Sequence, residues 1–134
     1  MSTTPRLPGR PLVSVIMPCR NGMPFVRHAV ERALAQKAPL ELLFVNVDSS
    51  DGSLQEVSAI DDDRIRVIEA PTGTAPGPAR NLAASRAQGD VLAFADADDL
   101  WRPDKLERQL RLRSETGAAL VYSDCRVIDG AGPQ

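Results

Sequence analysis

Three carboxylates lie within four residues of one another, at Asp96, Asp98 and Asp99, directly after the apolar run of residues 91–95. Such close charges repel one another when unpaired and raise each other's pKa, so the cluster favours a bound cation. Carboxylate oxygens suit Mg²⁺ or Mn²⁺, and Mg²⁺ usually takes further ligands from substrate phosphates. A metal-bound diphosphate is therefore one candidate ligand. The alternative is that these side chains only shape a turn and complement the N-terminus of the next helix.

Strands and helices must position this acidic turn, and the hydrophobic pattern predicts that they alternate. Short β-branched, apolar runs predict strands, whereas apolar residues at i, i+3 and i+4 predict helices. The predicted strands are residues 13–17, 42–47, 65–68, 91–95 and 119–122. The predicted helices are residues 24–34, 54–60, 79–87 and 103–113, the last one ended by Gly117. Three prolines and two glycines predict an irregular loop over residues 70–78.

Strands and helices that alternate at this spacing predict βαβ units. We therefore expect an α/β fold, with three αβα layers built around a mostly parallel, Rossmann-like sheet. Ligands of such sheets bind beyond the carboxyl ends of the strands, where the strand order reverses. Polar residues gather at four of these predicted ends, which are residues 18–21, residues 46–51, the loop that ends at Arg80, and residues 96–99.

Composition excludes several other classes of protein. The 134 residues fit one domain, and 16 basic against 18 acidic residues leave no basic surplus for binding nucleic acid. No apolar run approaches the roughly 18 residues of a transmembrane segment, and residues 1–11 lack the apolar stretch of a secretory signal. The spacing of Cys19, Cys125 and His28 argues against a disulfide scaffold or a zinc site. Because neither cysteine has an evident base partner, we expect both to be small buried thiols. We predict a cytoplasmic domain over residues 12–134, behind a disordered leader over residues 1–11.

Four motifs, in order along the chain, resemble the family 2 glycosyltransferases of the GT-A fold. They are residues 13–18 with Asn21 and Gly22, Ser50-Asp51-Gly52-Ser53, residues 78–83, and residues 94–101 followed by residues 103–106. The resemblance runs from about residue 12 to residue 110. It implies the GT-A fold and a nucleotide-diphosphate sugar as donor, with a UDP-sugar favoured.

The resemblance also implies roles for individual residues. Asp98 corresponds to the family's ligand for Mn²⁺ or Mg²⁺, and Asp96 is the first acid of the D-x-D motif, expected near the ribose and the metal. Arg80 lies where the family often has a basic residue that lines the nucleotide pocket. The other expected contacts with the nucleotide sugar are Pro18, Cys19, Arg20, Asn21, Asn46, Asp48 and Ala97.

The chain departs from the family pattern at residues 45–49. The family usually has Val-Asp-Asp-Gly-Ser there, and its first Asp hydrogen-bonds the base, whereas this chain has Val-Asn-Val-Asp-Ser. The Asn46 amide both donates and accepts, so it can still recognise a base edge, although in a different pattern. Either the nucleotide preference has changed or donor binding is weakened. Asp48 could replace the missing carboxylate only if the backbone were shifted.

The implied reaction is metal-assisted transfer of a sugar to an unknown acceptor, with inversion. Inversion needs a general base, which the family supplies from a segment beyond residue 134. We therefore expect this chain to lack the acceptor half of the site, and the apolar surface left uncovered predicts a homo-oligomer. One alternative is a truncated pseudo-enzyme that binds UDP or GDP without turnover. A phosphatase of the haloacid dehalogenase type also has D-x-D after a strand, but here too little chain follows residue 96.

Overall fold

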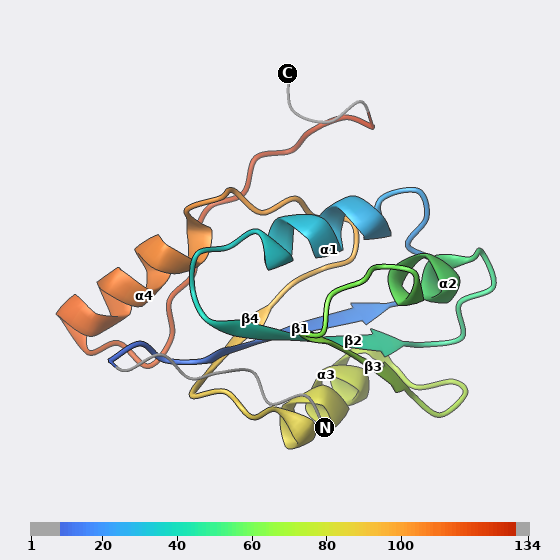
Figure 1. The fold of residues 1–134 in the computed structure, drawn as a ribbon, viewed down its shortest axis with the longest axis horizontal. Coiled ribbons are helices and arrows are strands. Elements are labelled where there is room, and N and C mark those ends of the chain that lie inside the picture. The colour runs from blue at the N-terminus through green and yellow to red at the C-terminus, as the bar shows by residue number, and fades with distance from the viewer. Residues whose placement is uncertain (1–8, 131–134) are drawn as a thin grey trace.

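Parallel strands form the centre of the molecule (Figure 1). The computed structural model describes residues 9–130. Its strands are β1 (Val13–Cys19), β2 (Leu40–Asn46), β3 (Ile65–Glu69) and β4 (Val91–Phe94). They lie in the order β3-β2-β1-β4, and every neighbouring pair is parallel. Because β2 and β3 lie on one side of β1 and β4 lies on the other, the strand order reverses between β1 and β4.

Helices cover both faces of this sheet. One face carries α1 (Val26–Leu34), α2 (Ser53–Ser58) and α4 (Lys105–Thr116), and the other carries α3 (Pro76–Arg86), as Figure 1 shows. Successive side chains of a strand point to opposite faces. Val15 accordingly packs in the cluster under α1, whereas Ile16 packs in the cluster under α3. The three-layer α/β fold expected from the sequence is therefore confirmed.

The two central strands are buried much more completely than β4. Every residue of β2 is buried, including the polar Glu41 and Asn46, as expected for a central parallel strand with both faces covered. Helix α3 packs on β1 and β2. Leu92 and Phe94 point to the same face as α3, next to Ser14 and Ile16 of β1, and both remain exposed. The β4 edge of the sheet therefore exposes apolar side chains to solvent.

Element boundaries differ from prediction where proline is involved. Helix α3 begins at Pro76 rather than at residue 79, because the first helical turn needs no N–H donor and accepts proline readily. Strand β1 continues through Pro18 to Cys19. Its pairing with β4 ends at Ile16, so Pro18 lies where β1 has only one neighbouring strand and a missing N–H is tolerated. The predicted end of α4 at Gly117 is confirmed, with a left-handed backbone at that glycine.

The predicted fifth strand is wrong. Residues 119–122 have the apolar composition of a strand but form none, and Leu120 and Tyr122 are 77% and 85% exposed. A strand is stable only when its backbone pairs with a neighbour, and no described strand pairs with this segment.

The predicted leader can be compared with the structure only in part. Its residues 1–8 lie outside the described residues, and residues 9–11 form neither helix nor strand. Within residues 9–130, no helix is both long enough and apolar enough to cross a lipid bilayer.

Candidate functional site

A cleft of about 640 Å³ opens at the carboxyl ends of β1 and β4, where the strand order reverses. Its walls are the loop after β1, the loop before α3 and the turn after β4. Most of the predicted site residues line it, namely Pro18, Cys19, Arg20, Asn21, Arg80, Asp96, Ala97 and Asp98. The sheet therefore brings residues from three distant parts of the sequence to one place, as expected for a parallel α/β sheet.

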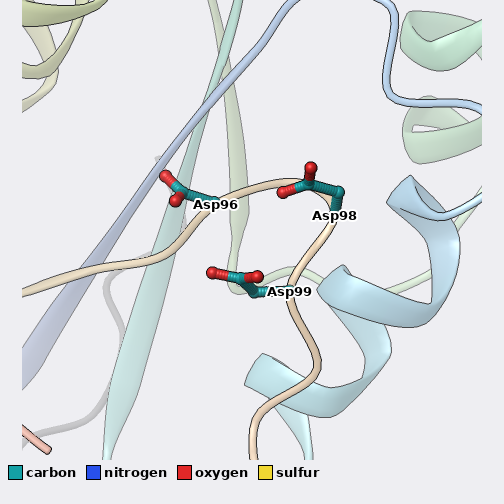
Figure 2. A group of neighbouring side chains, drawn as sticks. All are labelled: Asp96, Asp98 and Asp99. Atoms are coloured by element: carbon teal, nitrogen blue, oxygen red, sulfur yellow. The ribbon is translucent and has the colours of Figure 1, made fainter. Parts of the chain in front are cut away.

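The acidic turn after β4 projects three carboxylates from one short segment (Figure 2). Oxygen atoms of Asp96, Asp98 and Asp99 lie within 4.8 Å of one another, and all three residues are exposed. Asp96 and Asp98 line the cleft together with the largely buried Ala97 between them. Partial burial raises the pKa of Asp99, and the charges of the other two carboxylates raise it further. The turn therefore has the oxygen ligands and the unbalanced negative charge that suit a divalent cation.

Arg80 brings a positive charge from α3 to the same cleft. Its Nη2 lies 3.3 Å from Asp96 Oδ1, and the two side chains are 37% and 57% exposed. Exposed ion pairs contribute at most about 1 kcal/mol because water and salt screen them. Arg80 can therefore exchange this carboxylate for a ligand group at little cost.

Asn46 and Asp48, two further predicted contacts, do not line the cleft, although Val47 between them does. Asp48 has a φ of 51° where the family pattern has glycine, and its Oδ2 accepts a hydrogen bond of 2.9 Å from the Gly73 N–H. Gly73 belongs to the loop that lines the cleft before α3. Asp48 thus holds part of the cleft wall in place.

Asn46 ends β2 beside Cys19 of β1 and is 8% exposed. Its Oδ1 is buried and has no hydrogen-bond partner among the described residues. A buried polar atom without a partner costs about 1–3 kcal/mol. Asn46 therefore has an unused acceptor next to a residue of the cleft wall.

Cys19 lines the cleft but lacks the character of a nucleophile. Burial raises the pKa of its thiol. The thiol is therefore protonated at neutral pH, as expected for a buried structural cysteine. The same expectation is wrong for Cys125, which is exposed.

Sequence reasoning missed the side chains that connect the loop after β1 to the loop after β2. Ser49, Asp51 and Ser53 hydrogen-bond the backbone of residues 21–23, which line the cleft. The motif at residues 50–53 was a signal for this, but sequence alone assigned it no role at the site. Asn21 is also part of the connection, because its Oδ1 accepts a 2.8 Å hydrogen bond from the Ser50 N–H.

Proteins similar in sequence are glycosyltransferases. TuaG of Bacillus subtilis, a glycosyltransferase assigned to teichuronic acid biosynthesis, is 39% identical over 118 residues, which cover 85% of this chain and 46% of TuaG. The Escherichia coli UDP-Glc:alpha-D-GlcNAc-diphosphoundecaprenol beta-1,3-glucosyltransferase WfgD is 33% identical over 119 residues, or 88% of this chain and 47% of WfgD. The chain therefore spans about half the length of these relatives.

Solved structures agree with this family and with the GT-A fold. The mannosyltransferase PcManGT from Pyrobaculum calidifontis, solved in complex with GDP-Man and Mn²⁺, superposes with a TM-score of 0.73 at 26% identity, over 81% of this chain and 34% of that chain. The sequence profile of glycosyl transferase family 2 matches residues 14–134. With the parallel sheet, the cleft at its switch point and the acidic turn all in place, this chain belongs to glycosyl transferase family 2.

Proposed function

We propose that this chain carries the donor site of a metal-dependent glycosyltransferase, which binds a nucleotide-diphosphate sugar in the cleft and transfers the sugar, with inversion, to an acceptor still to be identified. One observation carries the proposal: the carboxylate cluster lies at the switch point of a parallel sheet, on the wall of a cleft of about 640 Å³. Sites for small molecules and cofactors usually have volumes of roughly 300–1,000 Å³. Membership of the family supports the same conclusion.

The acidic turn fits Mn²⁺ or Mg²⁺. Its carboxylates are exposed, so water and phosphate oxygens can complete the coordination that the carboxylates begin. We assign Asp98 and Asp96 as the residues that would hold the ion, because both line the cleft. When bound, a divalent cation stabilises the negative charge that develops on a leaving diphosphate. The complex of the similar PcManGT with GDP-Man and Mn²⁺ supports this assignment.

Arg80 and Asn46 are the residues proposed to recognise the rest of the nucleotide. Arg80 lines the cleft beside the acidic turn, where its guanidinium would contact the diphosphate. Asn46 lies beside Cys19 of the cleft wall and has a buried Oδ1 without a partner among the described residues. If the side chain turned toward the cleft, this atom would accept a hydrogen bond from an N–H of the base. Uracil and guanine both offer such an N–H, so the base has to be identified by measurement.

One observation favours a second candidate function, a module that binds nucleotide without turnover. Within the described part of the chain, the carboxylates that line the cleft are Asp96 and Asp98, and both are assigned to the cation. Asp124 and Asp129 do not line it. This chain therefore shows no separate carboxylate at the described cleft that would deprotonate an acceptor hydroxyl.

Calorimetric titration of the purified chain with UDP, GDP, dTDP and CDP, with and without Mn²⁺, tests the proposal. We expect at least one nucleotide to bind, and to bind more tightly with Mn²⁺. Asp98→Asn should remove the dependence on Mn²⁺. The matched control is Asp61→Asn, which removes the same charge from an exposed residue between α2 and β3 and should bind as the wild type does.

Absence of nucleotide binding, or binding that does not change in Asp98→Asn, would contradict the donor site. If binding is found, product analysis with the matching nucleotide sugar distinguishes the two candidates. Release of free nucleoside diphosphate together with a transferred or hydrolysed sugar supports the enzyme. An intact nucleotide sugar supports the binding module.

A further inference from the structure

Side chains of the loop after β2 and of Ser53, the first residue of α2, bind the backbone of the loop after β1. Three consecutive N–H groups donate to three different side chains: Asn21 to Ser49 Oγ at 3.0 Å, Gly22 to Ser53 Oγ at 2.8 Å, and Met23 to Asp51 Oδ2 at 2.9 Å. The loops are about thirty residues apart in sequence, and they meet because β1 and β2 are neighbours that end at the same edge of the sheet. The first loop is therefore shaped by the second.

Asp51 organises this connection with both of its carboxylate oxygens. Oδ1 accepts hydrogen bonds from the N–H and the hydroxyl of Ser53, at 3.0 and 2.6 Å, while Oδ2 accepts the one from Met23. Because the Ser53 hydroxyl donates to Asp51, its lone pairs are turned to accept from the Gly22 N–H. One carboxylate thus fixes two of the three backbone contacts, one directly and one through a serine.

Close packing leaves the first loop little freedom to move toward the core. A Cβ placed on Gly22 would lie 2.8 Å from Cys19 Sγ and 3.1 Å from Val26 Cβ. Ser53 is completely buried. The loop is therefore held on one side by tight contacts and on the other by the three hydrogen bonds.

These bonds determine what the cleft wall can offer a ligand. Consecutive backbone N–H groups in a turn commonly form a concave anion site. Here the N–H groups of residues 21–23 already donate to the second loop, so the wall presents its shape and its side chains to a ligand. Residues 18–23 line the cleft, whereas Asp51 and Ser53 do not.

We propose that Asp51 and Ser53 are positioning residues of the donor site, which fix the backbone of residues 21–23 and thereby the wall that receives the nucleotide, without touching the ligand themselves. This inference rests on the proposed function. It assigns the motif at residues 50–53 a role at the site, and it distinguishes that role from cation binding by the carboxylates of the acidic turn.

Asp51→Asn tests the inference because it keeps the size of the side chain but replaces one accepting oxygen with a donating nitrogen. Asp61→Asn is the control of equal charge. Hydrogen exchange of the amides of residues 21–23, followed by NMR without ligand, reports whether the loop is held. Calorimetry with the nucleotide that the wild type binds reports the donor site, and electron paramagnetic resonance of Mn²⁺ without nucleotide reports the acidic turn.

In Asp51→Asn we expect amide exchange in residues 21–23 to become about tenfold faster or more, as the loss of a hydrogen bond to a charged group implies. Nucleotide affinity should fall by about tenfold, while Mn²⁺ affinity should stay within about twofold of the wild type. Ser53→Ala should likewise lower nucleotide affinity and leave Mn²⁺ affinity close to that of the wild type. General disruption of the fold would instead lower both affinities.

Three results would overturn the inference. Unchanged exchange in Asp51→Asn would show that the carboxylate does not hold the loop. Faster exchange with unchanged nucleotide affinity would show that the loop does not form the nucleotide wall, and equal losses of nucleotide and Mn²⁺ affinity would show general damage. Failure of the proposed function is recognised separately, because the wild type would then bind no nucleotide, and the positioning role would be rejected with it.

Discussion

Replacing Glu41 with glutamine is expected to destabilise the protein by about 2 kcal/mol. Glu41 lies near the start of β2 and is 1% exposed. Its Oε1 accepts hydrogen bonds from Ser14 Oγ at 2.6 Å and from the Gln88 N–H at 2.7 Å, and its Oε2 accepts one from Arg66 Nη1 at 3.0 Å. These bonds join β1, β2, β3 and the segment after α3 at one buried point.

The expected loss of stability depends on which of the three hydrogen bonds to Glu41 a glutamine can still accept. Its single carbonyl oxygen can still accept from Ser14 and from Gln88, but its NH₂ group would face the guanidinium of Arg66, which is also a donor. One hydrogen bond to a charged group is then lost, which costs about 1.5–3 kcal/mol. Arg66 limits the loss because it also donates to the Arg86 carbonyl and is about one-third exposed. Glu41→Ala should cost more, since it also removes the acceptor of the buried Ser14 hydroxyl.

The effect should depend on pH in a defined direction. Burial by itself would raise the pKa of Glu41, but the hydrogen bonds from Ser14, the Gln88 N–H and Arg66 outweigh it and lower the pKa below its usual range. A lowered carboxyl pKa stabilises the folded state above the unfolded pKa of roughly 4.3, and this stabilisation is lost as the pH falls through the folded pKa. The difference between wild type and Glu41→Gln should therefore be largest at neutral pH and decrease below about pH 4.

Urea unfolding at pH 7 and at pH 3.5 measures both expectations. The matched control is Glu31→Gln, which makes the same substitution in a 2.9 Å ion pair with Arg27 on the exposed face of α1. We expect this control to leave the urea midpoint unchanged, because the pair is screened by solvent. Equal effects of the two substitutions, or a Glu41→Gln effect that is the same at both pH values, would refute the reasoning.

Three further predictions concern packing, thiol reactivity and the cleft. Gly89→Ala should destabilise the protein by about 1–3 kcal/mol, because a Cβ there would lie 2.5 Å from a hydroxyl and 2.7 Å from two backbone atoms, whereas Gly77→Ala fills open space and should be neutral or slightly stabilising in urea unfolding. Dithiobis(nitrobenzoic acid) should modify one thiol per folded chain, Cys125, because Cys19 is buried and burial raises its pKa; rapid modification of two thiols would contradict this. Arg80→Ala should change stability by less than about 1 kcal/mol but lower nucleotide affinity by about tenfold in calorimetry; unchanged affinity would place Arg80 outside the donor site.

The fold could be predicted well from sequence wherever burial leaves a pattern. The run that forms β2 is apolar almost throughout because both of its faces are covered, and α1 carries its buried residues on one face. Residues 119–122 have a similar composition but form no strand. Composition reports whether a segment suits a strand, whereas the existence of a strand also depends on a neighbour with which its backbone can pair.

Site residues were predictable from sequence where they directly follow a strand, because ligands of parallel sheets bind at the strand ends. Asp96 and Asp98 follow a strand, and the rule for parallel sheets places strand ends around one cleft, where the structure has both. The contacts of Asp51 and Ser53 with the loop after β1 follow from no such rule, because they join residues about thirty positions apart. Strand order had to be known before these two loops could be seen to meet.

The central strand β2 carries polar residues at both of its ends, and this layout affects how the protein can be changed. Glu41 lies near the start of β2 and Asn46 lies at its end. Five residue-to-residue steps along the strand separate these ends by roughly 17 Å. Substitutions at that separation usually have additive effects on free energy. Engineering at the Glu41 end can therefore compensate for destabilising changes at the proposed donor site, so stability and ligand binding can be selected independently.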